Sequence, residues 1–235
     1  MDKFETIVSE TEKYRNKSGI IFKLETLFKG IELKDRKVLD IGGGDGLMSF
    51  WMAYKGADVY CLEPGSDGSA EIDNTDYHHF EKQTQLEITL IKNTFQDFNT
   101  EAHFDLILIH NAINHLNEAA CERLGYDHAA FTTYIGYFEK LYALLKKDGI
   151  LILSDCSREN FWSNIHMKNP FIENIEWGKH QSPALWWRLA KNANFELTKI
   201  TWSTFNRLGQ FGKALLGNRT VAYFLISHFN LYLKK

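Results

Sequence analysis

A glycine-rich run near residue 40 constrains the fold of this chain more than any other feature. Val38-Leu39-Asp40-Ile41 is typical of a buried strand, and Gly42-Gly43-Gly44-Asp45-Gly46 follows it directly. A turn of this composition lets a ligand approach the backbone, because few side chains block the way. With a helix predicted to begin near Leu47, the unit is typical of a site for a nucleotide-like ligand.

The spacing of the glycines separates the classes of nucleotide site. Dinucleotide-binding turns follow the pattern G-x-G-x-x-G, whereas Gly42, Gly44 and Gly46 give G-x-G-x-G, with Leu47 where the last glycine would fall. A nicotinamide-dependent oxidoreductase is therefore disfavoured. A phosphate-binding P-loop is disfavoured as well, since no Gly-Lys-Ser/Thr sequence follows the turn.

Strand-like apolar runs alternate with helical patterns along most of the chain, which indicates the α/β class. We predict a doubly wound, mostly parallel sheet of seven strands with helices on both faces, an N-terminal helical cap and a C-terminal antiparallel strand. The predicted strands are 37–41, 58–62, 87–91, 104–109, 150–154, 195–202 and 220–227. The predicted helices are 3–14, 19–28, 47–54, 79–85 and 130–145, and Gly149 is expected to end the last of them.

An acidic residue follows the second predicted strand. Glu63 comes directly after Val59-Tyr60-Cys61-Leu62, at the carboxyl edge of the sheet where ligands of doubly wound folds bind. A carboxylate at this place can accept hydrogen bonds from both hydroxyls of a ribose. The glycine turn and Glu63, in this order, strengthen the prediction of a nucleotide-like ligand.

These motifs resemble those of the class I, Rossmann-like methyltransferases that depend on S-adenosylmethionine. The resemblance covers residues 37–155, and the first motif of the family is similar to V-L-D-I-G-G-G-D-G. Segments 104–116 and 144–152 are similar to the family's fourth strand with its following helix and to its fifth strand. The resemblance implies a methyltransferase fold, S-adenosylmethionine as the cofactor and S-adenosylhomocysteine as the product.

The resemblance also assigns residues to the cofactor. Asp40 and the glycine turn would hold the methionine part, and Glu63 would hold the ribose. Phe95 would lie against the adenine ring with Gln96 or Asp97 near its amine, although Thr94 stands where many members carry an acid. The predicted cofactor-binding residues are Asp40, Gly42, Gly43, Gly44, Glu63, Phe95, Gln96 and Asn111.

Two histidines are candidates for catalysis. Methyl transfer depends mainly on alignment at close range, but an alcohol acceptor would use a general base, and the ordinary pKa of histidine is near 6.5. A phosphate, carboxylate or enolate acceptor would need no base. His115 follows the fourth strand, and His180 precedes a helix that Ser182 and Pro183 are predicted to begin.

Acceptor-binding residues are expected in the loops after the fourth and fifth strands and in the segment that covers this edge. They are predicted to be Asn114, Asp155, Arg158, Glu176 and Gln181. No metal is predicted, since no spacing such as HExxH occurs. Segment 160–235 is similar to methyltransferases of surface-polysaccharide and small-metabolite pathways, which favours O-methylation of a sugar or of a phosphate or phosphoramidate group.

Composition bounds the domain count, the partners and the compartment. A chain of 235 residues with 44% hydrophobic content can bury one core, so we predict one domain: cap 1–35, cofactor-binding core 36–156, substrate-side insertion 157–194 and terminal strands 195–235. The net charge of −3 and the scattered basic residues disfavour nucleic acid. Three cysteines without a CxxC motif, a charged N-terminus and no apolar run of spanning length indicate the cytoplasm.

Several alternatives remain open from the sequence. The oxidoreductase is the first, although the glycine spacing disfavours it. A catalytically silent methyltransferase-like module is the second, although an intact turn and Glu63 argue for cofactor binding. The third is an N-methyltransferase that acts on an amino sugar or another small metabolite.

Overall fold

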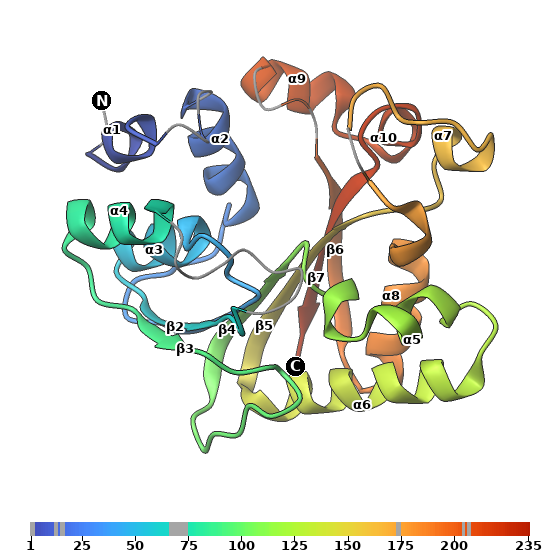
Figure 1. Ribbon diagram of the computed structural model, residues 1–235, viewed down its shortest axis with the longest axis horizontal. Coiled ribbons are helices and arrows are strands. Elements are labelled where there is room, and N and C mark those ends of the chain that lie inside the picture. Colours follow the sequence, from blue (N-terminus) through green and yellow to red (C-terminus); the bar gives the residue numbers. More distant parts are fainter. Residues whose placement is uncertain are drawn as a thin grey trace.

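The computed structural model describes residues 3–11, 14, 17–65, 75–172, 175–203, 205 and 208–235, and its centre is a seven-stranded sheet (Figure 1). The strands are β1 (Lys37–Ile41), β2 (Asp58–Leu62), β3 (Thr89–Ile91), β4 (Phe104–His110), β5 (Leu145–Cys156), β6 (Glu196–Trp202) and β7 (His228–Lys234). Their order is β3-β2-β1-β4-β5-β7-β6. The first five strands pair in parallel and β7 is antiparallel to both neighbours, so the predicted fold class is confirmed.

Helices cover both faces of the sheet. One face carries α1 (Lys3–Ser9), α2 (Lys17–Leu27), α3 (Leu47–Tyr54) and α4 (Thr75–Thr84), and the other carries α5 (Glu118–Arg123), α6 (His128–Leu144) and α8 (Pro183–Asn192). Three further helices, α7 (Phe161–Asn164), α9 (Gly209–Leu216) and α10 (Arg219–Phe224), lie together where β5 ends and β7 begins. None of the described helices has the length and apolar character needed to cross a bilayer.

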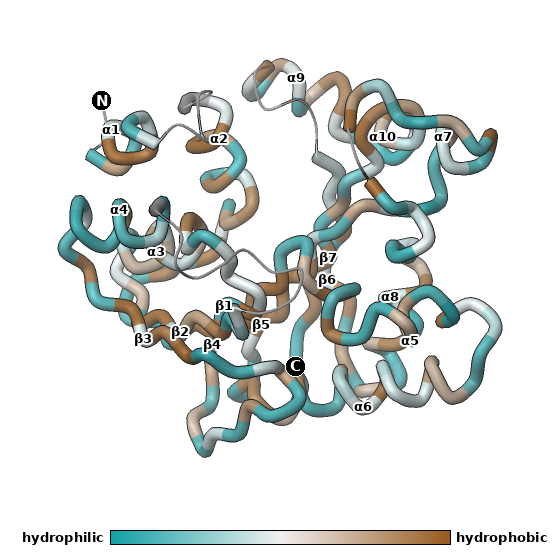
Figure 2. Tube along the Cα trace, viewed as in Figure 1, coloured by the Kyte–Doolittle hydropathy of each residue, from teal (hydrophilic) through white to brown (hydrophobic). Residues whose placement is uncertain are grey.

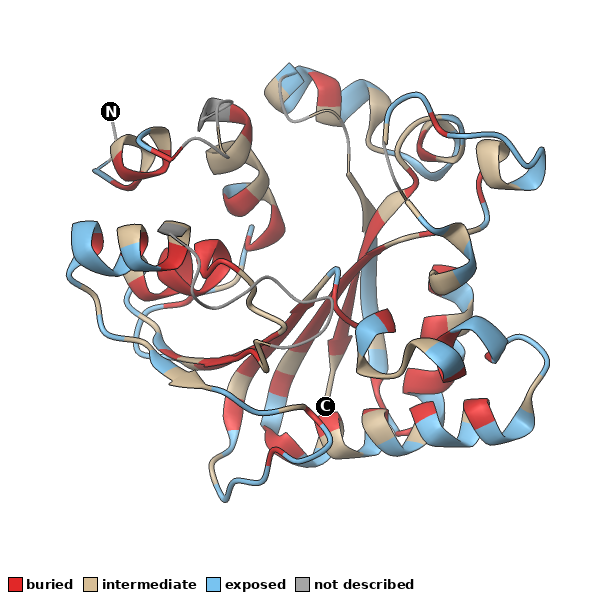
Figure 3. Ribbon diagram, viewed as in Figure 1, coloured by how far each residue is buried: buried red, intermediate tan, exposed pale blue. Residues whose placement is uncertain are grey.

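Alternation along the central strands builds two hydrophobic cores, one on each face of the sheet. Leu39 and Ile41 of β1 belong to the core beneath α6 and α8, whereas Val38 belongs to the core beneath α3. Successive strand residues point to opposite faces, and both faces are covered, so these strands are hydrophobic and buried along their length (Figures 2 and 3). The sheet is therefore a rigid support for the loops at its carboxyl edge.

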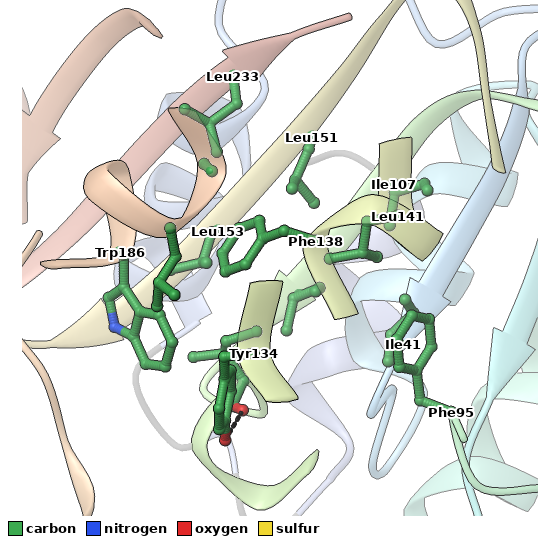
Figure 4. Packing of buried hydrophobic residues seen from close by; sticks show 14 of the residues in the cluster. Ile41, Phe95, Ile107, Tyr134, Phe138, Leu141, Leu151, Leu153, Trp186 and Leu233 are labelled. Carbon is green, nitrogen blue, oxygen red and sulfur yellow. Dashed lines mark hydrogen bonds between the residues drawn. The ribbon is translucent and has the colours of Figure 1, made fainter. Parts of the chain in front are cut away.

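The core beneath α6 and α8 is built around aromatic side chains (Figure 4). Trp186 is fully buried, and its ring centroid lies 5.4 Å from that of Tyr134 and 6.3 Å from that of Phe138. The Tyr134 hydroxyl donates to the backbone carbonyls of Ile113 and Asn117, at 3.1 and 3.2 Å. The core thus holds the loop after β4 in place, next to the edge where a ligand is expected.

The prediction of a strand over 220–227 is wrong, and so is the description of 195–235 as strands alone. Residues 219–224 form α10, because Asn218 caps this helix by accepting a hydrogen bond from the Val221 N–H at 3.0 Å. The last strand begins later, at His228, and α9 precedes α10. The β-branched and aromatic residues of Val221–Phe224 suggested a strand, but the local cap determines the structure.

The expected role of Gly149 is also wrong. Helix α6 ends at Leu144, and Gly149 lies inside β5, next to Asp148 with its positive φ of 63°. The pairing of β4 with β5 is irregular between Phe104 and Leu106, which accommodates these residues. The start of α8 is as predicted, with Ser182 as N-cap and Pro183 in the first turn.

Candidate functional site

The turn after β1 needs glycine both because neighbouring side chains leave no room for a Cβ atom and because of its backbone conformation. A Cβ atom on Gly42 would lie 2.4 Å from the Cβ of Ala112, and one on Gly43 would lie 2.4 Å from the Sγ of Cys61. Gly42 and Gly44 have φ values of 72° and 55°, which side chains disfavour. A Cβ on Gly44 would meet nothing within 4 Å, because this residue faces a cavity.

Glu63 is fixed beside the turn at the end of β2. Its carboxylate is 2% exposed and accepts the Gly44 N–H at 2.9 Å and the Gly65 N–H at 3.3 Å. These bonds hold one buried carboxylate at the mouth of the turn and leave it further capacity to accept hydrogen bonds. The structure therefore brings Glu63 and the glycine turn together, as the sequence predicts.

A cavity of about 660 Å³ opens in front of the turn. This volume lies within the range of about 300–1,000 Å³ that is typical of small-molecule and cofactor sites. The residues that line it are Ile41, Gly42, Gly44, Leu62, Glu63, Pro64, Asn93, Thr94, Phe95, Gln96, Asp97, Asn111, Ala112, His115, Leu116 and Glu118. Six of the eight predicted cofactor residues are in this lining, and Asp40 and Gly43 lie behind it.

Asp40 supports the turn from behind. It is 1% exposed and accepts a hydrogen bond from the Ser49 hydroxyl at 2.6 Å. Burial raises the pKa of Asp40 to about 7, against the effect of the Ser49 hydrogen bond, and the neighbouring charges of Glu63 and Asp45 raise the pKa further. The charge at this position therefore depends on pH near neutrality.

Replacing Asp40 with asparagine is expected to change how stability depends on pH. The unfolded chain releases the Asp40 proton near pH 3.8, whereas the folded protein keeps it to about pH 7, so rising pH favours unfolding between these values. Relative to Asp40→Asn, the wild-type free energy of unfolding should fall by at most about 1.4 kcal/mol per pH unit in this window. Urea unfolding at several pH values measures the difference, and parallel curves for the two proteins would contradict the prediction.

The loop after β3 forms the wall of the cavity that carries the residues predicted to face adenine. Phe95 is buried and packs edge-on against Tyr137, with ring centroids 6.0 Å apart. The Gln96 amide donates to the carbonyl of Leu116 and to the Tyr137 hydroxyl. The Lys140 ammonium donates to the carbonyls of Phe95 and Gln96, at 2.7 and 3.1 Å. These bonds tie the loop after β3 to α6 and fix this wall.

Asn111 connects the cavity to the C-terminal strand. Its backbone has a φ of 54°, and its N–H donates to the Ser154 carbonyl at 2.8 Å. Its Oδ1 lies 3.1 Å from Nε2 of His228, and Nδ1 of His228 lies 2.8 Å from the Ser203 hydroxyl. Burial lowers the pKa of His228 to about 3, so the ring is neutral and donates from Nε2 to Asn111. Sequence reasoning missed His228, because this residue was placed after the predicted last strand.

The structure joins His180 to Asp155. Asp155 is the second-last residue of β5. It is fully buried and accepts from Nδ1 of His180 at 2.8 Å, and the Cys156 N–H donates to the same oxygen at 2.8 Å. Oδ2 of Asp155 is buried and has no hydrogen-bond partner among the described residues. A carboxylate only accepts, so Nδ1 of His180 carries the hydrogen and Nε2 is left to accept a proton. Ser154, next to Asp155 in β5, pairs with His110 at the end of β4 and accepts the N–H of Asn111.

His115 and Glu176 belong to an ion-pair network at the rim of the cavity. Nδ1 of His115 lies 2.6 Å from Glu118, and the Lys179 ammonium lies 2.9 Å from Glu118 and 2.8 Å from Glu176. Hydrogen bonds from Lys179 and then from His115 lower the pKa of Glu118. Both His115 and Glu176 are exposed to solvent, whereas in the pair near the end of β5 Asp155 is fully buried and the His180 side chain is 15% exposed.

The other predicted acceptor residues lie around the Asp155–His180 pair. Gln181 is buried and donates to the Cys121 carbonyl at 2.5 Å, and Asn114 is buried in the wall after β4. Arg158 and Gln181 line a second, open cavity of about 780 Å³ together with His166 and Arg188. Two arginine side chains there, Arg158 and Arg188, can contact an anionic group, and the same lining contains one acid, Glu159.

Lys23 is a residue that sequence reasoning missed. It comes from α2 and lines a narrow cavity with Ser203 of the segment after β6 and Asn230 of β7. Burial lowers its pKa to about 8, and its charge helps to keep His110 and His228 neutral. A helix was predicted over residues 19–28, but no motif in the sequence distinguishes Lys23 from other lysines.

No group of three metal-ligand side chains occurs in the parts of the chain that the structure describes.

The order of the strands, the antiparallel last strand and the glycine turn at the edge of β1 define the Rossmann-like methyltransferase fold. A family model described as a methyltransferase domain matches residues 12–200, which is most of the chain. The chain therefore belongs to the methyltransferase domain family and is a methyltransferase. No curated protein matches the sequence.

Solved structures show the same fold at low sequence identity. A methyltransferase from Clostridium acetobutylicum aligns with a TM-score of 0.62 at 11% identity, over 97% of this chain and 96% of its own. Magnesium protoporphyrin IX methyltransferase from Synechocystis, solved with bound S-adenosylmethionine, gives 0.58 at 13%, over 100% and 90%. The 1,6-didemethyltoxoflavin-N1-methyltransferase from Burkholderia thailandensis, solved with substrate and S-adenosylhomocysteine, gives 0.58 at 13%, over 95% and 81%.

Proposed function

We propose that this protein transfers a methyl group from S-adenosylmethionine to a hydroxyl group of a small molecule. The cavity in front of the glycine turn is the cofactor site. Glu63 accepts from the ribose hydroxyls, and Phe95 and Gln96 contact the adenine ring. The turn backbone and Asn111 face the methionine part of the cofactor. When bound, the cofactor supplies a methyl group on a positively charged sulfur.

The observation that carries the hydroxyl acceptor is the pair formed by the fully buried Asp155 and the partly exposed His180. A base that is oriented by a buried carboxylate is useful only if the acceptor must lose a proton. In this proposal His180 Nε2 takes that proton, while Asp155 holds the tautomer through Nδ1 and stabilises the charged ring that forms. A phosphate or carboxylate acceptor is already ionised and would not use such a pair.

The second cavity supports an acceptor that carries a negative charge elsewhere in the molecule. Arg158 and Arg188 can contact a phosphate or carboxylate there, and Gln181 borders both this cavity and the base. A sugar that bears a phosphate or an acidic group combines the hydroxyl and the charge. We therefore propose such sugars, as used in surface-glycan or small-metabolite pathways, as the acceptor class.

N-methylation is the second candidate. The structurally similar protein from Burkholderia is named as an N1-methyltransferase, which supports nitrogen as an acceptor atom for this fold as well. An amine that is protonated at neutral pH would also need a base. The atom that receives the methyl group therefore distinguishes the two candidates.

Transfer of a labelled methyl group tests the proposal. The protein is incubated with S-adenosylmethionine carrying a ¹³C methyl group and with a panel of sugar phosphates, nucleotide sugars, uronic acids and amino sugars. Carbon-13 NMR separates O-methyl from N-methyl products. We expect an O-methyl product from an acidic or phosphorylated sugar, and products on nitrogen alone would overturn the hydroxyl assignment.

A further inference from the structure

The face of the sheet that carries α5, α6 and α8 (Figure 1) has two adjoining cavities. The second cavity, of about 780 Å³, is lined by Arg158 and Gln181, and a third, open cavity of about 430 Å³ is lined by Tyr126. Gly125 and Arg188 line both, so the two cavities form one continuous groove, which we call the α8 groove. The second cavity alone lies within the range of about 300–1,000 Å³ that is typical of small-molecule sites. The α8 groove therefore has room for a molecule larger than a single sugar phosphate.

One end of the α8 groove adjoins the proposed general base. Glu118 lines the cofactor cavity, and its carboxylate lies 2.9 Å from the Lys179 ammonium. Gln181 lines the α8 groove. His180 stands between Lys179 and Gln181 in the sequence and so lies between the cofactor cavity and the groove. An acceptor that presents a hydroxyl group to His180 would therefore extend along the groove, away from the cofactor.

The two arginines of the α8 groove have no acidic partner. Arg158 and Arg188 form no ion pair with the residues that the structure describes, although Glu159 lies in the same lining. The Arg188 guanidinium instead lies 4.8 Å from the ring centroid of Phe131, and this contact holds it where the two cavities meet. Guanidinium groups bind phosphate oxygens through pairs of N–H donors. Two of them in one groove match the two phosphates of a diphosphate.

The other end of the α8 groove carries an exposed aromatic side chain on a well-held turn. Tyr126 is 81% exposed, and its backbone N–H donates to the Arg123 carbonyl at 3.0 Å. The next residue, Asp127, caps α6 by accepting the Ala129 N–H at 2.8 Å. Asp127 also forms an ion pair with Arg123 at 3.1 Å, so this acid of the lining already has a partner. An exposed aromatic ring in such a position offers a stacking surface for a nucleobase.

We propose that the methyl acceptor is a sugar linked to a nucleoside diphosphate, and that the α8 groove binds its nucleotide part. The inference rests on the proposed methyl transfer to a sugar hydroxyl. The groove presents, in order, the general base, two arginines and an exposed ring, and such an acceptor presents a hydroxyl, two phosphates and a nucleobase. Arg158 and Arg188 contact the diphosphate, and Tyr126 stacks on the nucleobase. An oligosaccharide matches less well, because it would place neutral rings beside both arginines.

Calorimetric titration with nucleoside diphosphates tests the inference without requiring methyl transfer. The full chain is titrated with the diphosphates of uridine, thymidine, cytidine, guanosine and adenosine, each with and without saturating S-adenosylhomocysteine to occupy the cofactor cavity. We expect at least one diphosphate to bind in both conditions, and its monophosphate to bind more weakly. Tyr126→Ser should weaken the binding by about tenfold, as expected for the loss of one stacked base. Arg188→Gln should weaken it by about tenfold or more and reduce its salt dependence.

Tyr126→Phe and Lys191→Gln are the matched controls. The first keeps an aromatic ring, and the second removes an exposed charge from α8 outside both linings, so both should bind like wild type. Thermal unfolding checks that every variant is folded. The inference would be overturned if none of the five diphosphates binds, if S-adenosylhomocysteine displaces them, or if Tyr126→Ser and Arg188→Gln bind as tightly as wild type.

Methyl transfer separates a failure of this inference from a failure of the proposed function. Diphosphate binding that depends on Tyr126 and Arg188, without methyl transfer to any sugar, would support the nucleotide site and reject the proposed reaction. Equal rates of transfer to a free sugar phosphate and to the same sugar linked to a nucleoside diphosphate would retain the reaction and overturn the inference.

Discussion

Replacing Glu63 with alanine is expected to abolish measurable binding of S-adenosylhomocysteine. The variant removes a buried carboxylate that accepts the Gly44 N–H at the turn and that we propose accepts from two ribose hydroxyls. Each hydrogen bond to a charged group contributes about 1.5–3 kcal/mol, so the loss of two corresponds to roughly 10²–10⁴-fold in affinity. Isothermal titration calorimetry of the two proteins with the same ligand measures this change.

Two controls make this result specific. Glu139→Ala removes a carboxylate from an exposed position of α6 that lies outside the cavity, and it should bind like wild type. Titration with NAD should give no heat of binding, because the glycine spacing differs from that of dinucleotide sites. Unchanged affinity in Glu63→Ala would place the cofactor elsewhere, and binding of NAD would return the oxidoreductase to consideration.

Replacing His180 with alanine is expected to lower kcat by about 10²–10⁴-fold for a hydroxyl acceptor, the range that a general base contributes. Binding of S-adenosylhomocysteine should remain close to wild type, because His180 lies outside the lining of the cofactor cavity. Asp155→Asn should also lower kcat, since asparagine cannot stabilise the charged ring and can present its amide to Nδ1. Single-turnover methyl transfer with saturating cofactor measures the chemical step.

His115→Ala is the matched comparison for His180→Ala. Both histidines pair with a carboxylate, but His115 is half-exposed at the rim and bonds to the partly exposed Glu118. We expect its removal to change kcat far less than the removal of His180. A larger loss of kcat in His115→Ala than in His180→Ala would contradict this prediction and identify His115 as the general base.

The cofactor half of the site could be predicted because local sequence determines it. A strand, a turn that needs positive φ and an acid at the end of the next strand are consecutive features, and parallel pairing brings them to one edge. The acceptor half depends on contacts between distant segments. His180 is 25 residues from Asp155, and Asn111 is 117 residues from His228, so only the folded sheet shows that they meet.

The error over residues 219–224 has a local physical cause. Residues 219–224 carry β-branched and aromatic side chains, yet the cap at Asn218 makes them helical, and the strand follows four residues later. Such short segments near the chain end have weak intrinsic preferences, and packing decides between helix and strand. The central strands were predictable because continuous apolar runs leave little choice.

The direction of the last strand has a practical consequence. Because β7 runs against β5, its first residue, His228, reaches the edge that carries Asn111, whereas Lys235 bonds to Gly149 and Leu145 at the opposite edge. Any polypeptide fused after Lys235 would start on the side of the sheet away from the cavity. A fusion placed before α2 would instead start near the helix that brings Lys23 over the edge. For labelling or immobilising a functional enzyme, attachment after Lys235 is therefore preferable.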